Sequence, residues 1–216
     1  MNWIRARQPD QIAERRSDIL TSAAAMLEVK ELESVTLGDI AESAGISKAN
    51  IYRYFSSRDE IYLTIFVMER ESFAHELIER IGRCRAKDRI SRIAEIWAET
   101  ALAHVTLLEL YPRLHTTLER NSSVDQIAEL KKTGGAMLRR SAAAHHALVP
   151  EIDESAWYGI TQASVALMTG FWHFVNPDEK VRLAMSRPDV DQPSMDFRSM
   201  FVSSQAAMIR GHVPRV

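Results

Sequence analysis

The residues best suited to chemistry on a partner lie between Thr36 and Phe55, where the chain reads TLGDIAESAGISKANIYRYF. Thr36 and Asp39 have the spacing of a capping box, which predicts that a helix begins directly after Thr36. Gly45 tolerates the left-handed conformation that ends such a helix, and Ser47 is suited to cap the start of a second helix. The run therefore predicts two short helices joined by a tight turn.

The second helix of this pair, expected over residues 48–54, has an inward and an outward face. Ile51 and Phe55 are four residues apart, so both can pack inward. The outward side chains carry cationic, amide and phenolic groups, which contact base edges and phosphates in protein–DNA complexes. We expect the bases to be read by Ser47, Lys48, Ala49, Asn50 and Arg53 and the phosphates to be held by Thr36, Tyr52, Tyr54 and Arg58.

Two flanking features support this interpretation. Ser57 and Glu60 have capping-box spacing, which predicts a third helix beginning at Arg58. A cation in a first turn opposes the helix dipole, so an external anion such as a DNA phosphate would explain Arg58. Arg5 and Arg7 are expected on a flexible N-terminal arm that adds electrostatic attraction to DNA.

This part of the chain resembles the TetR/AcrR family of bacterial transcriptional regulators. The resemblance covers roughly the first 65 residues, and a basic residue after the aromatic pair at Tyr52 and Phe55 is a strong signature of the family. It is carried by residues 17–24 (SDILTSAA), Thr36 to Ala41, Ala44 to Ser47, and Ile51 to Phe55. The resemblance implies a DNA-binding head on a larger helical body that binds an effector and dimerises.

Composition and charge agree with such a protein. The chain has 216 residues, 46% of them hydrophobic, which is enough for a small head and a larger body. The formal net charge of −2 lacks the basic excess typical of DNA-binding proteins, so a local basic patch at Lys48, Arg53 and Arg58 has to suffice. No apolar run could span a membrane and the first residues lack a signal peptide, so a cytoplasmic protein is expected.

We predict an all-α fold of about nine helices, because no convincing strand pattern is present and no proline occurs between Asp10 and Tyr111. A head of residues 1–57 contains the arm and the helix-turn-helix, and a body of residues 58–216 binds the effector and dimerises. The helix at 58–81 links the two. The remaining helices are expected over about residues 10–31, 88–109, 112–121, 123–148, 153–174 and 194–210.

A stripe of small residues on the helix at 153–174 would allow another helix to approach closely. We expect a two-fold homodimer in which the last two helices pack as a four-helix bundle, because a single recognition helix contacts too few base pairs to be selective. Packing of the stripe within its own chain is the alternative. The interface residues would be Gly159, Ala163, Ala166, Gly170, Phe197, Met200, Phe201 and Met208.

Aromatic and polar side chains in the body predict a pocket for a small apolar or aromatic effector. Its lining would be Trp97, Thr100, His104, Trp157, Gln162 and Phe171. The same residues suit a core filled by side chains, and the protein would then be a constitutive DNA-binding or scaffold protein without an effector. The histidines lack metal-ligand spacing and Cys84 has no second cysteine, so neither a metal nor a cofactor is expected.

An enzyme is the competing class. The chain has no G-x-S-x-G, no Walker loop and no glycine-rich nucleotide turn, and no glutamate lies three residues before any histidine, as a di-iron carboxylate site requires. We therefore predict a transcriptional repressor that leaves a palindromic operator when an effector binds.

Overall fold

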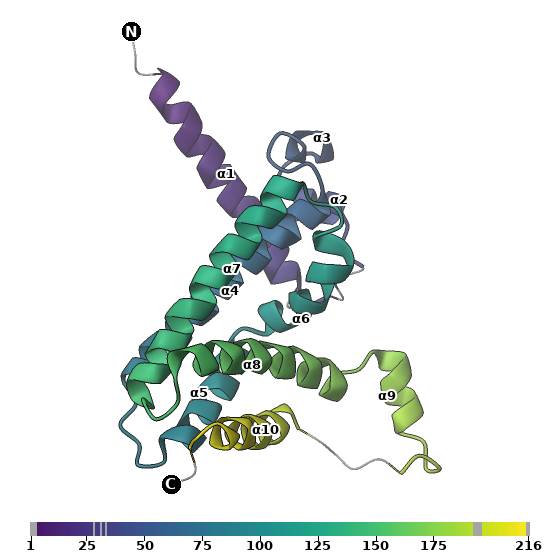
Figure 1. Ribbon diagram of the computed structural model, residues 1–216. Coiled ribbons are helices and arrows are strands. Elements are labelled where there is room, and N and C mark those ends of the chain that lie inside the picture. The colour runs from purple at the N-terminus through teal and green to yellow at the C-terminus, as the bar shows by residue number, and fades with distance from the viewer. Residues whose placement is uncertain (1–3, 28, 31, 33, 192–195, 215–216) are drawn as a thin grey trace. The chain divides into compact units, whose positions relative to one another are not determined.

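The computed structural model describes residues 4–27, 29–30, 32, 34–191 and 196–214, and its secondary structure over these residues is helical. The side chains of residues 4–9 and 115 are outside the description. The helices, labelled in Figure 1, are α1 (Ile4–Leu27), α2 (Leu37–Ser43), α3 (Lys48–Ile51), α4 (Arg58–Gly82), α5 (Arg89–Ala103), α6 (Val105–Arg113), the π-helix η1 (Leu114–Leu118), α7 (Val124–Leu148), α8 (Glu154–Val175), α9 (Glu179–Met185) and α10 (Phe197–Gly211).

The all-α prediction is confirmed, but the described chain has eleven helical elements where about nine were expected. The helix predicted over 88–109 breaks at His104, which caps the end of α5 with φ −121° and ψ 52°. The sixth helix does not begin near Pro112, because this proline lies inside α6. The π-helix η1 begins directly after the end of α6. Helix α9 occupies a region predicted to be only a connection, and residues 192–195 of that connection lie outside the described residues.

The chain forms two compact units that are not consecutive in sequence. The first unit comprises Met1–Glu69 and Leu110–Ile127, and the second comprises Arg70–Glu109 and Ala128–Val216. Helix α4 passes from one unit into the other at residues 69 and 70. The boundary predicted at residue 57 divides the chain by function and not by compactness, and it stays a prediction.

Within the first unit, α1 packs on α2 and α2 packs on α3. Helix α1 already begins at Ile4, so the flexible arm predicted for Arg5 and Arg7 is replaced by helical backbone. The side chains of these two arginines lie outside the described residues. The core of the unit is formed by buried apolar side chains from each helix, among them Ile19, Ala23, Ile40, Ile51, Phe55, Ile61 and Phe66.

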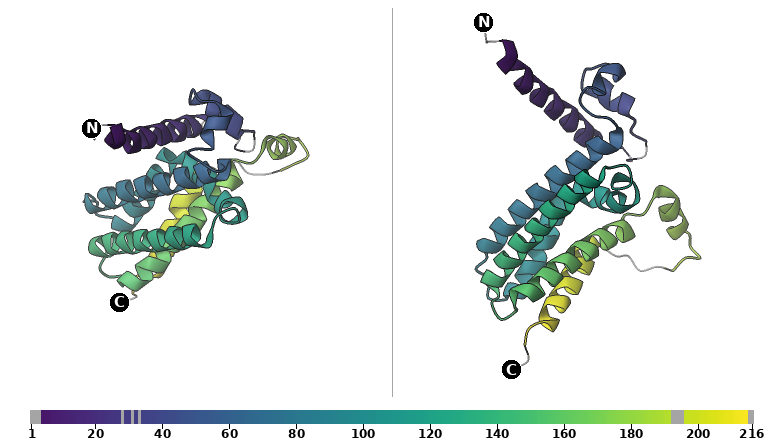
Figure 2. Two further views of the ribbon diagram at one scale, coloured as in Figure 1. Left: turned by 90° about the horizontal axis from the view of Figure 1, so that it is seen from above. Right: turned by 45° about the horizontal axis from the view of Figure 1, so that its top comes forward.

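Within the second unit, α10 packs along α5 and α8, and the second view in Figure 2 shows α8 and α10 running together. Phe201 of α10 is fully buried and its ring centroid lies 6.4 Å from that of Trp97. Helix α9 buries none of its residues and projects beyond the end of α8 in Figures 1 and 2. The described residues contain no helix long and apolar enough to cross a membrane.

A buried polar network crosses the core of the second unit at His145. Its Nε2 accepts a hydrogen bond from the indole N–H of Trp97 at 2.9 Å. Because an indole nitrogen can only donate, the imidazole proton resides on Nδ1, which donates to the backbone oxygen of Ser141 at 2.7 Å. The ring of Trp157 lies 5.0 Å from the imidazole, and complete burial lowers the pKa of His145 to about 4.

We expect this histidine to make the fold sensitive to acid. The imidazole of the unfolded chain takes up a proton near pH 6.5, whereas that of the folded chain takes it up only near pH 4. The folding stability that depends on the neutral, buried imidazole is therefore complete above pH 6.5 and is lost as the pH falls toward 4. The loss should be about 3 kcal/mol of unfolding free energy. Urea unfolding of the wild type and of His145→Gln between pH 7 and 4 measures it: the stability difference should shrink with falling pH, and a constant difference would contradict a buried neutral imidazole.

Candidate nucleic-acid interface

The start of α2 has the reciprocal cap that the sequence predicts. The Thr36 hydroxyl accepts from the Asp39 backbone N–H at 3.2 Å, and the Asp39 carboxylate accepts from the Thr36 backbone N–H at 2.8 Å. The Thr36 hydroxyl also donates to this carboxylate at 2.7 Å. These bonds hold the pKa of Asp39 below its usual value. The hydroxyl of Thr36 is therefore committed to the cap, and its predicted phosphate contact would have to replace a bond that already exists.

The turn between α2 and α3 is closed by backbone hydrogen bonds. Gly45 has φ +67°, the left-handed conformation that glycine adopts without steric cost. The N–H of Ile46 donates to the oxygen of Ala41 at 2.9 Å, and that of Gly45 donates to the oxygen of Glu42 at 3.0 Å. This pair of bonds is a Schellman motif. The chain thereby passes from the end of α2 at Ser43 to the start of α3 at Lys48.

Helix α3 is shorter than predicted. It ends at Ile51, and residues 52–54 continue as a turn in which the Arg53 N–H donates to the Asn50 oxygen at 3.1 Å. The side chains of Ser47, Lys48, Ala49, Asn50 and Arg53 are all exposed, and so is Tyr52, at 56%. Ile51 and Phe55 are buried as predicted. The structure thus brings every predicted base-reading residue to the surface of one short segment.

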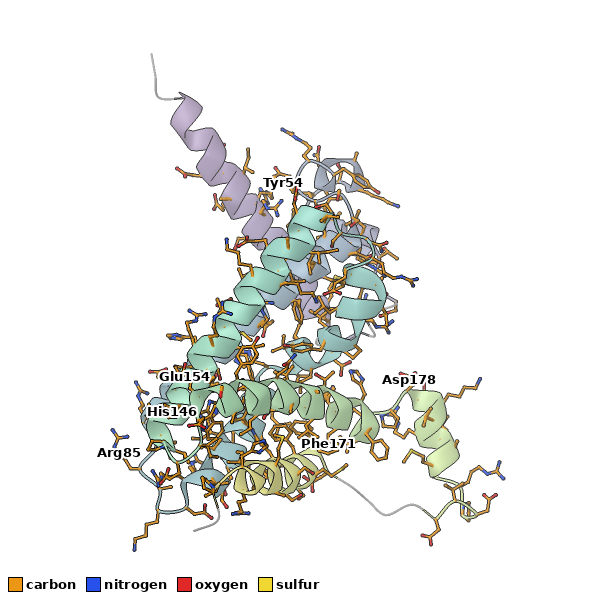
Figure 3. All side chains as sticks on the ribbon, in the orientation of Figure 1. Tyr54, Arg85, His146, Glu154, Phe171 and Asp178 are labelled. Carbon is orange, nitrogen blue, oxygen red and sulfur yellow. The ribbon has the colours of Figure 1, made fainter. Side chains whose placement is uncertain are left out.

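Two of the predicted contact residues are partly engaged within the protein. The Ser47 hydroxyl accepts from the Asn50 backbone N–H at 3.2 Å, so it caps α3. Tyr54 is half-buried, and Figure 3 places it beside α1 and α3. Their DNA contacts stay predictions.

Arg58 has partners in the protein, so an external anion is not needed to explain it. Its Nη1 donates to the Val35 oxygen at 2.9 Å, and its Nε lies 3.8 Å from a carboxylate oxygen of Asp59. The guanidinium also lies 5.4 Å from the ring centroid of Tyr62, a cation–π distance. Arg58 therefore ties the start of α4 to the segment that precedes α2, and its phosphate contact stays a prediction.

Arg16 of α1 is a positioning residue that sequence reasoning missed. Its Nη1 donates to the backbone oxygen of Tyr54, and its guanidinium lies 4.0 Å above the ring centroid of Phe55. One side chain thus fastens α1 to the turn that follows the recognition helix. A lone arginine in a run of charged residues gives no signal for this contact, which depends on a partner 38 residues away.

The residues predicted for a dimer interface divide into two groups. Gly159, Ala166 and Gly170 are exposed on α8, and Ala163, Met200 and Met208 are half-buried. Phe197 and Phe201 are instead buried within their own chain, where their rings stack at 5.6 Å, so they are not available to a partner. An apolar groove of about 400 Å³ lies on this face and is lined by Ala163, Ala166, Leu167, Gly170, Phe171 and Met208.

The residues predicted for an effector pocket lie in different surroundings. Trp97, Thr100 and Trp157 are buried in the core, and each has a hydrogen-bond partner. His104 lies 3.3 Å from a carboxylate oxygen of Glu76. Gln162 is exposed on α8 and is not among the residues that line the apolar groove, so its role in an effector pocket stays a prediction. Phe171, labelled in Figure 3, lines the apolar groove. The described residues contain no group of acidic, histidine and cysteine side chains that could hold a metal ion.

The fold and the site define a helix-turn-helix DNA-binding transcriptional regulator. Residues 19–65 match the family described as "Bacterial regulatory proteins, tetR family", and residues 68–215 match the "Tetracyclin repressor-like, C-terminal domain". The chain belongs to the TetR family. The members of this family are transcriptional regulators and not enzymes, as the sequence predicts.

Curated relatives match over part of the chain. The HTH-type transcriptional regulator Rv1255c of Mycobacterium tuberculosis is 32% identical over 82 residues, which cover 38% of this chain and 35% of that protein. The HTH-type transcriptional repressor KstR2 of Mycolicibacterium smegmatis is 40% identical over 53 residues, 24% of this chain and 26% of that repressor. The chain therefore aligns with about a third or less of the length of these relatives.

Solved structures show the same fold across both units. A TetR-family regulator from Mesorhizobium loti has a TM-score of 0.57 at 14% identity, covering 94% of this chain and 98% of the other. The TetR-family regulator PfmR from Thermus thermophilus has a TM-score of 0.53 at 17% identity, covering 91% of this chain and 99% of the other. At such identities the likeness concerns the fold alone.

We expect Arg16→Ala to weaken DNA binding although Arg16 reads no base. Loss of the bond to Tyr54 and of the contact with Phe55 should lower the unfolding free energy by about 1–3 kcal/mol and loosen the recognition segment. Chemical unfolding and fluorescence anisotropy with duplex DNA measure the two effects. Arg15→Ala is the matched control, since Arg15 is exposed and pairs only with Asp18 in the described structure; equal effects of both changes would refute the positioning role.

Proposed function

We propose that this protein is a transcriptional repressor that binds a palindromic operator as a homodimer and is released by a small-molecule effector. The observation that carries the proposal is the exposure of Lys48 and Asn50 on α3 and of Arg53 in the turn that follows it. The start of α3 and the turn before it are held by hydrogen bonds, and Ile51 is buried behind the exposed side chains. The similarity of part of the chain to the repressor KstR2 supports repression over activation. Within this proposal the protein would act in the cytoplasm, where its DNA target lies.

Within this proposal, Lys48, Ala49, Asn50 and Arg53 contact base edges and Tyr52 contacts phosphate. Lysine and arginine suit guanine, the asparagine amide suits adenine, and the alanine methyl group suits the methyl group of thymine. The phenol of Tyr52 is exposed and can donate to a phosphate oxygen, which sets the register on the duplex without reading sequence. Ser47, Thr36, Tyr54 and Arg58 complete the proposed contact surface.

The proposed dimer uses the groove between α8 and α10. Small residues at 159, 163, 166 and 170 leave this face of α8 almost flat, and the groove they share with Met208 is apolar. A second copy related by a two-fold axis would present the same face, so the two grooves would close against each other. Gln162 lies on this exposed face and would join the interface in place of its predicted role in the pocket.

The proposed effector site lies in the core of the body, where buried polar atoms have no hydrogen-bond partner among the described residues. They are Ser141 Oγ, Thr161 Oγ1 and Gln205 Oε1. Buried polar atoms without partners are uncommon, and a ligand that brings polar groups to them would satisfy them. Trp97 and Trp157 surround the neighbouring His145, so the same region would offer aromatic contact to the apolar part of the ligand.

Release would follow if the effector prefers a conformation in which the heads do not match the operator. Helix α4 belongs to both units, so a ligand that displaces its body end would tilt the head and change the distance between the two recognition helices. A preference of about 2.8 kcal/mol would weaken operator affinity about a hundredfold by linkage. If every compound that binds the body leaves DNA affinity unchanged, the alternative of a constitutive DNA-binding protein holds.

The division between base and phosphate contacts predicts different effects of single changes. Lys48→Ala and Asn50→Ala should each cost about 1–3 kcal/mol at particular base pairs, whereas Tyr52→Phe should weaken specific and non-specific DNA alike. Selection of random duplexes at a stated salt concentration, with sequencing of the retained DNA, measures preference for each variant. Tyr158→Phe in α8 serves as the control, and equal losses on all sequences for the three head variants would contradict the assigned roles.

We expect Ala166→Arg to produce a monomer. An unpaired charge placed in an apolar interface costs about 3 kcal/mol or more, which raises the dimer dissociation constant more than a hundredfold. Sedimentation velocity measures the change, and the variant should also stop enriching a palindrome. Ala143→Arg is the matched control because Ala143 is exposed on α7. A dimer that survives Ala166→Arg would show that this face of α8 is not the interface.

A further inference from the structure

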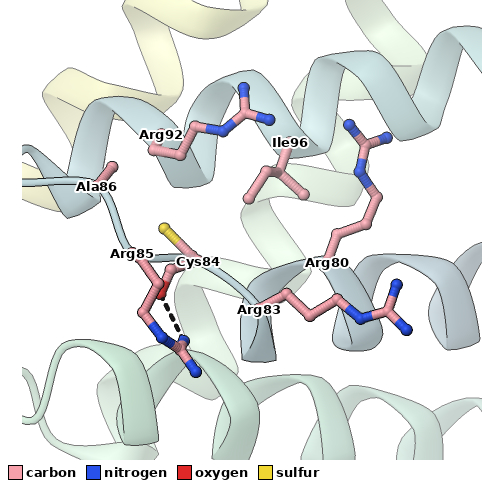
Figure 4. A pocket seen from close by; sticks show the side chains of 7 residues that line it. All are labelled: Arg80, Arg83, Cys84, Arg85, Ala86, Arg92 and Ile96. Atoms are coloured by element: carbon pink, nitrogen blue, oxygen red, sulfur yellow. Dashed lines mark hydrogen bonds between the residues drawn. The ribbon is translucent and has the colours of Figure 1, made fainter.

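A small pocket lies where the end of α4 and the start of α5 meet, within the second unit. It has a volume of about 280 Å³ and is lined by Arg80, Arg83, Cys84, Arg85, Ala86, Arg92 and Ile96. Figure 4 shows Arg80 extending from α4, Arg92 and Ile96 from α5, and Arg83, Cys84 and Arg85 from the segment between the helices. Four of the seven lining residues are arginines and none is acidic.

The carboxylates that balance these arginines lie outside the lining and are shared. Glu99 pairs with Arg80, with Arg92 at 3.1 Å and with Arg198 at 3.1 Å, so three guanidinium groups meet one carboxylate. Glu76 and Glu95 supply a second partner to Arg80 and Arg92. These ion pairs hold the guanidinium groups of Arg80 and Arg92, and none of the three carboxylates lines the pocket.

The other two arginines are less well neutralised. Arg83 lies directly after the end of α4 and pairs with Glu79, four residues earlier. Its side chain is 77% exposed, and such surface pairs contribute little to stability. Arg85 donates to the backbone oxygens of Gly82 and Cys84 at 3.0 and 2.8 Å. Among the described residues no carboxylate forms an ion pair with Arg85. Its guanidinium is thus held beside the pocket while its charge stays uncompensated.

We propose that this pocket binds a phosphate group of a small anion. Planar guanidinium groups bind phosphate oxygens through paired, charge-assisted hydrogen bonds, and several cations from different elements suit an anion with several oxygens. The volume lies just below the range of about 300–1,000 Å³ for sites that hold a whole drug-sized ligand, which fits a phosphate or diphosphate group. Cys84 and Ile96 supply the uncharged part of the wall.

The pocket shares no lining residue with the predicted effector site or with the helix-turn-helix, although Arg80 donates to the Thr100 hydroxyl at 3.2 Å. The proposed repressor function does not require this pocket, so failure of the tests below would leave that function standing. Free phosphate and the diphosphate of an organic molecule offer the same chemistry to the arginines. A phosphate of duplex DNA is the competing occupant, because residues 80–89 form a basic stretch in the sequence.

Cys84 is the only cysteine in the chain and lines the pocket, so its alkylation reports occupancy directly. The full-length protein is treated with iodoacetamide, an uncharged reagent, and the modified fraction is followed by mass spectrometry. Inorganic phosphate, pyrophosphate, ADP and duplex DNA are compared with chloride at equal ionic strength. We expect phosphate or pyrophosphate to slow alkylation at least fivefold in a saturable manner, and protection by ADP would identify an organic diphosphate as an occupant.

Arg85→Gln should abolish this protection, whereas Arg187→Gln, which removes an exposed arginine paired with Asp189, should preserve it. Titration calorimetry of both variants measures binding without relying on the thiol, and thermal unfolding shows that each variant is folded. Binding of phosphate or pyrophosphate that is lost only in Arg85→Gln supports the site. Protection by DNA alone, or no binding of any phosphate compound by the folded wild type, overturns the proposal.

Discussion

The structure of the head depends on the backbone hydrogen bonds of the turn at Gly45. The N–H of Ile46 reaches back to the oxygen of Ala41, which is possible only because Gly45 adopts φ +67°. Any other residue would be strained there. This turn sets the direction of α3 and hence which side chains face outward. A helix of only four residues has little stability of its own, so its orientation has to come from the turn, from the Ser47 cap and from the buried side chain of Ile51.

Two arginine side chains then hold the helix-turn-helix against the helices on either side of it in the sequence. Arg16 reaches from α1 to the turn after α3, and Arg58 reaches from α4 to the oxygen of Val35 before α2. Both guanidinium groups also lie over aromatic rings, those of Phe55 and Tyr62. The burial that raises the pKa of Tyr62 to about 12 shows how closely α4 packs against this part of the head. Arg58, which the sequence predicts as a phosphate contact, thus also connects two segments of the head.

The core of the body differs from that of the head because it buries polar side chains, which need hydrogen-bond partners there. The tautomer of His145 is set by Trp97 and by the oxygen of Ser141. The same unit also buries hydroxyl and amide oxygens that have no hydrogen-bond partner among the described residues. On the outer side, the bare face of α8 leaves an apolar groove beside α10. Phe197 and Phe201 turn inward from α10 and fill the core, while Met208 remains at the groove. A buried centre with unmet polar groups and a flat outer face are the two features that the proposed effector and the proposed partner subunit would complete.

The sequence alone determined the features that depend on neighbouring residues: the cap at Thr36 and Asp39, the turn at Gly45, the cap at Ser47, the start of α4 and the bounds of α7 and α8 within one or two residues. Such signals act over three to five residues and can be read directly. It also determined that Ile51 and Phe55 face inward, since helical spacing decides this. Only the tertiary structure decided that Arg58 has partners within the protein and that Arg16 holds the turn after α3. It also decided that Phe197 and Phe201 are buried in the core and that Gln162 is exposed. Each of these outcomes depends on which distant helix lies opposite the side chain, and local spacing carries no information about that choice.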